Sequence, residues 1–401
     1  MDRLKIAIVA DYAEEGWASM DLVAEMLATR LTRVHQDVID ATLIRPRFVR
    51  PLTQFGSLGR SKLAFNAERV LNRYFLYPLW IRRQRGNFTL FHIVDHSYSH
   101  LTNHLPADRT IITCHDIDAF RAILAPSRGP RAAISRAIAS PILRGFRRAA
   151  MVTCVSRATW EAIVEHGLRA PLTTVVIANG VDSLMSPDPD TASDAAAESI
   201  LGRCNTEAPE IVHVGSTEPR KRIEVLLQVF AGVARKFPNA RLIRVGGGLM
   251  PEHWRVANAL GIKDRIVIMP FLERRVLASV YRRAAAVLLP SDAEGFALPL
   301  LEAMACGRPV VASDLPALRE VGGDLAIYCA VDDVTSWIQA VCTLLEGRED
   351  REQVSARTAW AARFSWDTHC TSTVELYRAV AEMATGKKAA ISVQGLEPST
   401  E

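Results

Sequence analysis

The stretch SDAEGFALPLLEAMACGRPVVAS, Ser291–Ser313, decides the fold because it joins two short apolar strands through a single helix. The apolar run Ala286–Pro290 precedes it, and it closes with the β-branched run Arg308–Ser313. A strand, one crossover helix and a second strand form a unit whose two strands run parallel. The stretch therefore predicts a parallel sheet that helices cover on both faces.

The same alternation of apolar strands and amphipathic helices fills the rest of the chain. A first group of strands is predicted at Lys5–Ala10, Phe91–Asp95, Arg109–Cys114, Met151–Val155 and Thr173–Ala178. A second group is predicted at Glu210–Gly215, Arg241–Gly246, Arg265–Pro270, Ala286–Pro290 and Arg308–Ser313. We expect two doubly wound α/β units in tandem.

The boundary between the units is predicted in Asn179–Ser199, which is rich in Asp, Ser and Pro and is typical of a loop and linker. We expect an N-terminal domain at 1–183 and a C-terminal domain at 184–365. Helical periodicity then runs over about 366–385. Residues 386–401 lack periodicity, which predicts a disordered tail.

The composition is that of a soluble globular protein, with 401 residues, 49% of them hydrophobic and 23% charged. No long apolar run or signal-peptide pattern is present, so we expect a cytoplasmic protein. Its seven cysteines lack the spacing of a metal site or disulfide framework. We expect all seven to be reduced packing residues.

Positive charge is concentrated in the first half of the chain. Residues 45–85 hold ten basic residues and one acid, Glu68, and residues 119–150 hold seven arginines and no acid. Arginines alternate with aromatic residues in Arg69–Arg85, which predicts contact with an anionic acceptor or the anionic inner face of a membrane. An amphipathic core helix with a solvated basic face explains the pattern equally well. No nucleic-acid-binding motif accompanies the charge.

Two glutamates mark a candidate anion and sugar site around the helix of the fold-deciding stretch. Pro299 suits the first helical position, which makes Leu298 the expected N-cap and leaves the amides around Phe296–Leu301 without a side-chain partner. Such amides bind anions. Glu294 in the entering loop and Glu302 one turn inside the helix are expected to face the same crevice. A sugar nucleotide supplies a diphosphate for the amides and hydroxyls for both carboxylates, whereas the alternative is a surface helix with Glu302 solvated.

A second helix start carries three cations. Val214–Leu227 runs from a strand through a turn at Gly215 into a helix, with Arg220, Lys221 and Arg222 at its entrance. Cations at a helix N-terminus oppose the helix dipole, so we expect them to meet a phosphate rather than form a solvated basic turn.

In the first unit, polar side chains follow the predicted strands at the end where parallel sheets bind ligands. His115 is expected to donate to a sugar hydroxyl or to the reacting oxygen, with Asp116 holding its orientation. A second polar group after a strand is expected to contact substrate: Asp95, His96 and Tyr98. Gly16, before the first helix, allows backbone to approach a phosphate or acceptor.

These residues resemble the retaining glycosyltransferases of family 4. The likeness lies in the E-x7-E pattern of Ser291–Ser313 and continues through EPRK, Val155–Gly167, Ile177–Asp182, Leu277–Phe296 and Phe364–Cys370. The resemblance implies a GT-B fold of two facing Rossmann-like domains, with the helix from Trp366 crossing back to the first domain. It also implies same-face transfer of a hexose, such as mannose or glucose, from a nucleotide sugar to a glycan or lipid-linked acceptor.

The resemblance also assigns roles by position. It implies that Glu294 contacts the transferred sugar, Glu302 the ribose, and Lys221 with Arg220 the diphosphate. His115 is implied to line the donor sugar. Backbone around the donor is implied at Gly16, Gly215, Phe296, Ala297 and Leu298. Ser216 departs from the family, which often has arginine there, and Ala297 stands where glycine is frequent.

No metal or organic cofactor is implied, since the nucleotide sugar is a substrate. Two alternatives remain open from the residues. One is a metal-dependent transferase that uses Asp116–Asp118 or Asp188–Asp190 as an Asp-x-Asp motif. The other is a non-catalytic nucleotide-sugar-binding protein. A nicotinamide-dependent oxidoreductase is disfavoured because no GxGxxG opens a helix after the first strand.

Overall fold

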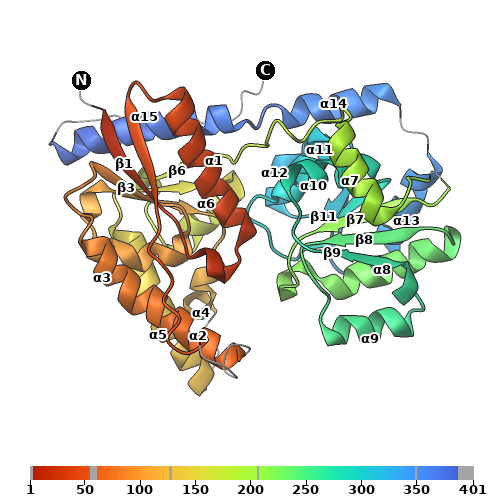
Figure 1. Ribbon diagram of the computed structural model, residues 1–401, viewed down its shortest axis with the longest axis horizontal. Helices are drawn as coiled ribbons and strands as arrows, with labels where there is room; N and C mark the ends of the chain where they lie inside the picture. The colour runs from red at the N-terminus through yellow and green to blue at the C-terminus, as the bar shows by residue number, and fades with distance from the viewer. Residues whose placement is uncertain (1–2, 55–60, 126–128, 206, 348–349, 387–401) are drawn as a thin grey trace. The chain divides into compact units, whose positions relative to one another are not determined.

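The computed structural model describes the chain except residues 1–2, 55–60, 126–128, 206, 348–349 and 387–401. It divides into two compact units (Figure 1). Unit 1 comprises the chain through Asn179 together with the chain from Trp366, and unit 2 is Gly180–Ser365. The division falls between Asn179 and Gly180, a few residues before the predicted 183/184 boundary. The predicted tail, apart from Gly386, lies outside the described residues.

Unit 1 is built on a six-stranded parallel sheet in the order β2-β1-β3-β4-β5-β6. Its strands are β1 (Leu4–Val9), β2 (Ile39–Ile44), β3 (Leu90–Ile93), β4 (Thr110–Cys114), β5 (Met151–Cys154) and β6 (Thr174–Val176). Its α-helices are α1 (Ala18–Val34), α2 (Lys62–Leu71), α3 (Tyr77–Arg82), α4 (Arg121–Leu124), α5 (Pro130–Arg148), α6 (Arg157–Glu165) and α15 (Trp366–Ala384). A π-helical segment, η3 (Asn72–Leu76), joins α2 to α3, and a 3-10 segment, η4 (His96–His104), follows β3.

Alternation along the strands gives unit 1 two apolar layers. Ile6 and Ile8 of β1 face the layer that contains Tyr377 of α15, whereas Ala7 and Val9 face the layer that contains Phe146 of α5. Because both faces are covered, every residue from Ile6 to Val9 is almost fully buried. Figure 1 shows the first helix, α1, and the last, α15, beside each other on this unit.

Unit 2 carries a second six-stranded parallel sheet, in the order β12-β11-β10-β7-β8-β9. Its strands are β7 (Glu210–Val214), β8 (Arg241–Val245), β9 (Ile266–Met269), β10 (Ala286–Leu289), β11 (Val310–Ser313) and β12 (Ile327–Cys329). Its α-helices are α7 (Thr191–Leu201), α8 (Ile223–Lys236), α9 (Pro251–Ala259), α10 (Arg274–Arg283), α11 (Leu298–Ala305), α12 (Pro316–Gly322), α13 (Val334–Glu346) and α14 (Arg351–Ala361). Helices α8, α9 and α13 cover one face (Figure 1).

Two expectations about local structure are wrong. The predicted linker contains helix α7, which begins because the Asp190 carboxylate accepts hydrogen bonds from the amides of Ala192 and Ser193. The same carboxylate pairs with Arg275 at 3.0 Å. Of the seven cysteines, six are buried as expected, but Cys204 is exposed. Among the described residues, no helix is long and apolar enough to span a bilayer.

Candidate functional site

The loop after β10 leads into helix α11 through a residue in the left-handed conformation. Ala297 has a φ of 66° and is the N-cap, and its side chain makes no capping hydrogen bond. The helix therefore begins at Leu298 with Pro299 as its second residue, one position earlier than the sequence predicts. The expectation of a helix start without side-chain capping holds, so the amides of the first turn can serve an anion.

Glu294, in this loop, is the centre of a buried charged group. Its side chain is 6% exposed, and its carboxylate accepts hydrogen bonds from Lys221 Nζ at 2.5 Å, Ser291 Oγ at 2.7 Å and Arg220 Nη1 at 3.4 Å. Burial alone raises the pKa of Glu294, but Lys221 and Arg220 outweigh it and hold that pKa below its ordinary value. The carboxylate is therefore ionised at neutral pH. Glu294, predicted to bind the sugar, contacts both Lys221 and Arg220, which were predicted to bind the diphosphate.

Arg222 does not join this group, contrary to the prediction that all three cations meet a phosphate. It has a φ of 48° and is the N-cap of α8. Its guanidinium pairs with Asp332 and lies 3.6 Å from Asp292. Arg222 therefore neutralises carboxylates on another side of the turn, and two cations remain beside Glu294.

Glu302 lies in the second turn of α11 and is 6% exposed. Its Oε2 accepts a hydrogen bond from the Tyr281 hydroxyl at 2.9 Å. Burial raises the pKa of Glu302, and the Tyr281 hydrogen bond and Arg274 offset this only in part. Arg274 is itself paired with Asp182 at 2.8 Å. Glu302 is thus a buried carboxylate held by a hydroxyl, not the solvated residue of the alternative interpretation.

The turns after β7 and β8 lie against each other. A Cβ placed on Gly246 would be 2.2 Å from the Gly215 carbonyl oxygen, so only glycine permits this approach. The Ser216 hydroxyl accepts a hydrogen bond from the Glu218 amide at 3.4 Å. Gly215 and Ser216 therefore form a tight turn that precedes Arg220 and Lys221 in the chain.

In unit 1, His115 follows β4 and is buried. Its Nε2 donates to the Val94 carbonyl at 2.7 Å, so Val94, and not Asp116 as predicted, fixes the ring. Burial lowers the pKa of His115, which favours the neutral ring with Nδ1 as the acceptor. Asp116 instead lies 3.4 Å from Nε2 of His96. Although burial opposes it, Asp116 and Asp95 raise the pKa of His96.

Of the other predicted residues of unit 1, Asp95 and Tyr98 make structural contacts and Gly16 faces open space. Asp95 caps η4 by accepting from the amide of Ser97 at 2.8 Å. Tyr98 is 1% exposed, and the guanidinium of Arg73 lies 4.1 Å from its ring centroid. Gly16 has a φ of 74° and a Cβ placed there would contact nothing within 4 Å, which leaves room for an approaching group.

Sequence reasoning missed several buried polar residues, on strands, after a strand and on a helix. Asp11 follows β1 and is 1% exposed, with no hydrogen-bond partner for either carboxylate oxygen. The strand-end rule that selected Asp95 also selects Asp11. His213 and Arg244 lie inside β7 and β8, and Tyr281 lies on α10. His213 and Arg244 were not predicted as site residues, because a single polar residue within an apolar strand is usually assigned to the core.

The Asp-x-Asp alternatives have other partners. Asp190 is the N-cap described above, and the Asp116 carboxylate accepts a hydrogen bond from the Asp118 amide at 2.9 Å. Within the described parts of the chain, no group of three His, Cys, Asp or Glu side chains is arranged to hold a metal ion.

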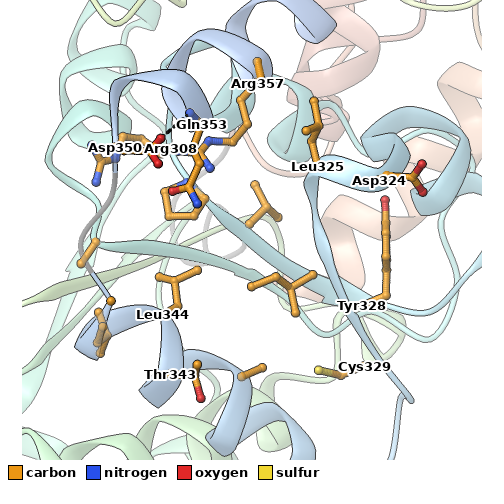
Figure 2. Close-up of a pocket in the computed structure, with 18 of the residues that line it drawn as sticks. Arg308, Asp324, Leu325, Tyr328, Cys329, Thr343, Leu344, Asp350, Gln353 and Arg357 are labelled. Carbon is orange, nitrogen blue, oxygen red and sulfur yellow. Dashed lines mark hydrogen bonds between the residues drawn. The ribbon is translucent and has the colours of Figure 1, made fainter.

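A cavity of about 1050 Å³ lies elsewhere in unit 2, between the edge strand β12 and helices α13 and α14 (Figure 2). Arg308, Tyr328, Gln353 and Arg357 are among its lining residues. It shares no residue with the group around Glu294 and Glu302.

The chain is similar to known glycosyltransferases in part of its sequence and in its fold. Residues 208–347, within unit 2, match the family model of the glycosyl transferases group 1. A structure of Anabaena Alr3699/HepE in complex with UDP and glucose superposes with a TM-score of 0.69 at 18% identity, covering 94% of this chain and 100% of that one. WaaG, a glycosyltransferase involved in lipopolysaccharide biosynthesis, gives a TM-score of 0.65 at 14% identity over 95% of this chain and 99% of its own. The chain has a GT-B fold.

Curated relatives of this GT-B chain are D-inositol 3-phosphate glycosyltransferases. That of Segniliparus rotundus is 35% identical over 212 residues, which is 51% of this chain and 46% of the relative. That of Xylanimonas cellulosilytica is 34% identical over 214 residues, half of each chain. The chain thus spans about half the length of the curated relatives it matches. The predicted fold class is confirmed.

Proposed function

We propose that the protein is a glycosyltransferase that moves a hexose from a nucleoside diphosphate sugar to an acceptor hydroxyl with retention of configuration. The observation that carries the proposal is the buried group of Glu294, Lys221 and Arg220 beside the uncapped start of α11. The match of residues 208–347 to a glycosyltransferase family model supports it. So does the UDP-glucose complex of the structural neighbour HepE.

In the proposed reaction, the bond between the anomeric carbon and the diphosphate oxygen breaks, and its electron pair leaves with the diphosphate. Lys221, Arg220 and the first amides of α11 stabilise that developing charge. Such stabilisation by preorganised groups is usually the largest single contribution to catalysis. The acceptor oxygen bonds to the anomeric carbon on the same face and passes its proton to the departing phosphate. No metal or other cofactor takes part, so a chelator should leave turnover unchanged.

The carboxylates are proposed to bind hydroxyls. Glu294 is ionised and accepts from hydroxyls of the transferred hexose, while it keeps Lys221 in place. Glu302, held by Tyr281, accepts from the ribose. His115 of unit 1 is proposed to contact the donor sugar through Nδ1, since Nε2 is bound to Val94.

The acceptor is proposed to be a glycan or lipid-linked molecule presented at an anionic membrane surface. Five large apolar residues along the continuous segment α2–η3–α3 are exposed, among them Leu63 at 81% and Phe75 at 60%; the others are Val70, Leu71 and Leu79. We call these five residues the apolar stripe. The opposite side of the segment is buried through Tyr77 and Ile81, as the core-helix alternative predicts, and the exposed stripe is what supports a membrane contact. Basic residues adjoin the stripe at its end: Arg82, Arg83 and Arg85.

Flotation with vesicles of acidic phospholipid at low salt tests the membrane contact. We expect the protein to float with the vesicles and Phe75→Ser to reduce the bound fraction at least threefold. Leu172→Ser is the matched control, because Leu172 is 84% exposed elsewhere in unit 1. Absence of binding at low salt removes the membrane contact from the proposal.

The donor assignment is tested by thermal shift with UDP, GDP and ADP sugars, followed by turnover of the sugar that raises the melting temperature. Lys221→Met and Glu294→Gln should each lower turnover by on the order of a hundredfold, as for loss of one oxyanion donor. Arg222→Met is the matched control, since the neighbouring Arg222 pairs with Asp332 instead. Near-normal turnover in both site variants would refute the assignment, and binding without any transfer would favour a nucleotide-sugar-binding protein.

A further inference from the structure

A buried arginine and a buried histidine lie side by side in the sheet of unit 2. Arg244 of β8 is paired in register with His213 of β7, and both side chains are 0% exposed. Opposed residues in a sheet direct their side chains to the same face. Such positions in a parallel sheet normally hold apolar residues, as Ile211 and Leu242 do in the same strands.

The guanidinium of Arg244 joins the two strand-end turns. It donates to the carbonyls of Gly215 at 3.0 Å and Ser216 at 2.9 Å, which belong to the turn after β7. It also donates to the carbonyl of Gly247, which belongs to the turn after β8. One side chain therefore sets the relative position of both turns, the first of which leads to Lys221.

This cation is not neutralised by the protein. Among the described residues, no carboxylate is paired with Arg244, and its Nε has no hydrogen-bond partner. Burial lowers the pKa of Arg244 to about 10, which still leaves the group charged at neutral pH. A buried charge that is held only by carbonyl dipoles is costly, and a bound anion offsets that cost.

Two side chains lie beside the turn that Arg244 holds, namely His213 and Lys221, and Lys221 is paired with Glu294. A Cβ placed on Gly215 would lie 3.5 Å from Cε1 of His213 and 3.8 Å from Cε of Lys221, so both side chains lie beneath this turn. Burial, Arg244 and Lys221 together hold the pKa of His213 well below its ordinary value. Both ring nitrogens of His213 lack a hydrogen-bond partner. The neutral imidazole thus adds no charge that would compete with an anion for Arg244.

We propose that Arg244 is a positioning residue for the diphosphate of the donor: it fixes the two turns that approach the phosphates and supplies an unneutralised positive charge directly beneath them. The inference rests on the proposed function and names a residue inside the sheet as part of the diphosphate site. Ser216, in the turn itself, contributes a hydroxyl and no charge. The ligand class that this arrangement recognises is a nucleoside diphosphate, in preference to a monophosphate or an uncharged nucleoside.

The test compares ligands that differ only in phosphate content. Dissociation constants for UDP, UMP and uridine, or the GDP or ADP series if the unaltered protein prefers it, are measured by calorimetry and competition. Arg244→Met should weaken diphosphate binding at least tenfold while nucleoside binding changes less than twofold. Arg244→Lys, which keeps the charge but not the three-carbonyl contact, should weaken diphosphate binding by roughly threefold to tenfold. His213→Phe is the matched control at the same depth and should change diphosphate binding less than threefold.

The outcomes separate the two proposals. Equal weakening of diphosphate and nucleoside by Arg244→Met means that Arg244 only supports the fold, and overturns the inference while the donor assignment stands. Unchanged diphosphate binding in Arg244→Met also overturns it. If Arg244→Met does not fold, Arg244→Lys decides by the same comparison. Absence of any nucleoside diphosphate binding by the unaltered protein overturns the proposed function, and this inference with it.

Discussion

Asp11 makes the stability of unit 1 depend on pH. The residue follows β1, is almost fully buried, and has no hydrogen-bond partner for either oxygen. Burial, helped by the nearby carboxylates Asp95 and Asp21, raises its pKa from 3.8 to about 8. Its own backbone amide, which falls short of hydrogen-bond geometry, and Arg45 oppose this rise. We predict that Asp11→Asn stabilises unit 1 at neutral and alkaline pH.

The magnitude follows from the proton balance of the two states. Between pH 3.8 and about 8 the unfolded carboxyl is ionised and the folded one is protonated, so the folded state binds the extra proton. Stability therefore falls as pH rises through this window, by at most about 1.4 kcal/mol per pH unit. The full window corresponds to an upper bound of about 6 kcal/mol, and relaxation and water entry around the carboxylate reduce it to roughly 2–4 kcal/mol.

The assay is urea unfolding of the wild type and Asp11→Asn at pH 5 to 9, with hydrogen exchange of β1 peptides to report on unit 1. The two proteins should be closest in stability at pH 5, and the gap should widen in favour of Asp11→Asn up to about pH 8. Asp37→Asn is the control, because Asp37 is exposed in the turn before β2 and should give a gap that does not change with pH. A gap that stays constant from pH 5 to 9 in Asp11→Asn would refute the reasoning.

Three further predictions concern unit 2. Tyr281→Phe removes the hydroxyl that donates to buried Glu302 and should lower the free energy of unfolding by about 1.5–3 kcal/mol in urea titrations; unchanged stability contradicts the contact. Gly246→Ala places a Cβ 2.2 Å from the Gly215 oxygen, so the two turns must separate. The melting temperature should fall by several degrees and the thermal shift produced by nucleotide sugar should be lost; a normal shift contradicts the turn contact. Iodoacetamide should label native protein at one cysteine, Cys204, since the other six are buried; mass spectrometry of more than one labelled site contradicts this.

The parts of the fold that local pattern specifies were predictable. Within the described part of the chain, ten of the twelve strands correspond to apolar runs in the sequence. The two that were missed are the edge strands β2 and β12. In β2, three of the six residues are buried, and β12 has only Cys329 fully buried, so neither shows the continuous apolar run of a central strand.

The sequence indicated candidate site residues where they follow the carboxyl end of a predicted strand. The approach of Glu294 to Lys221 agrees with both being at strand ends of one parallel sheet. The contact between Arg222 and Asp332 was not predicted, because the two residues are 110 positions apart and no local sequence pattern indicates it. The role of Arg244 was also not predicted. Its hydrogen bonds to the turn after β7 depend on the register of β7 and β8, which the sequence does not indicate.

The attachment of helix α15 has a consequence for how the chain matures during synthesis. His92 of β3 forms a hydrogen bond through Nδ1 with the Tyr377 hydroxyl of α15 at 2.6 Å and another through Nε2 with Thr113 of β4 at 2.7 Å. These bonds hold α15 against the sheet of unit 1. Unit 1 thus lacks part of its apolar layer until the ribosome has passed Gly180–Ser365, a span that takes roughly 10–40 s at about 5–20 residues per second. Unit 2 is contiguous and can fold before α15 is made. A nascent chain that stops before Trp366 should therefore contain a folded unit 2 and a unit 1 with one apolar layer exposed, which a chaperone can bind.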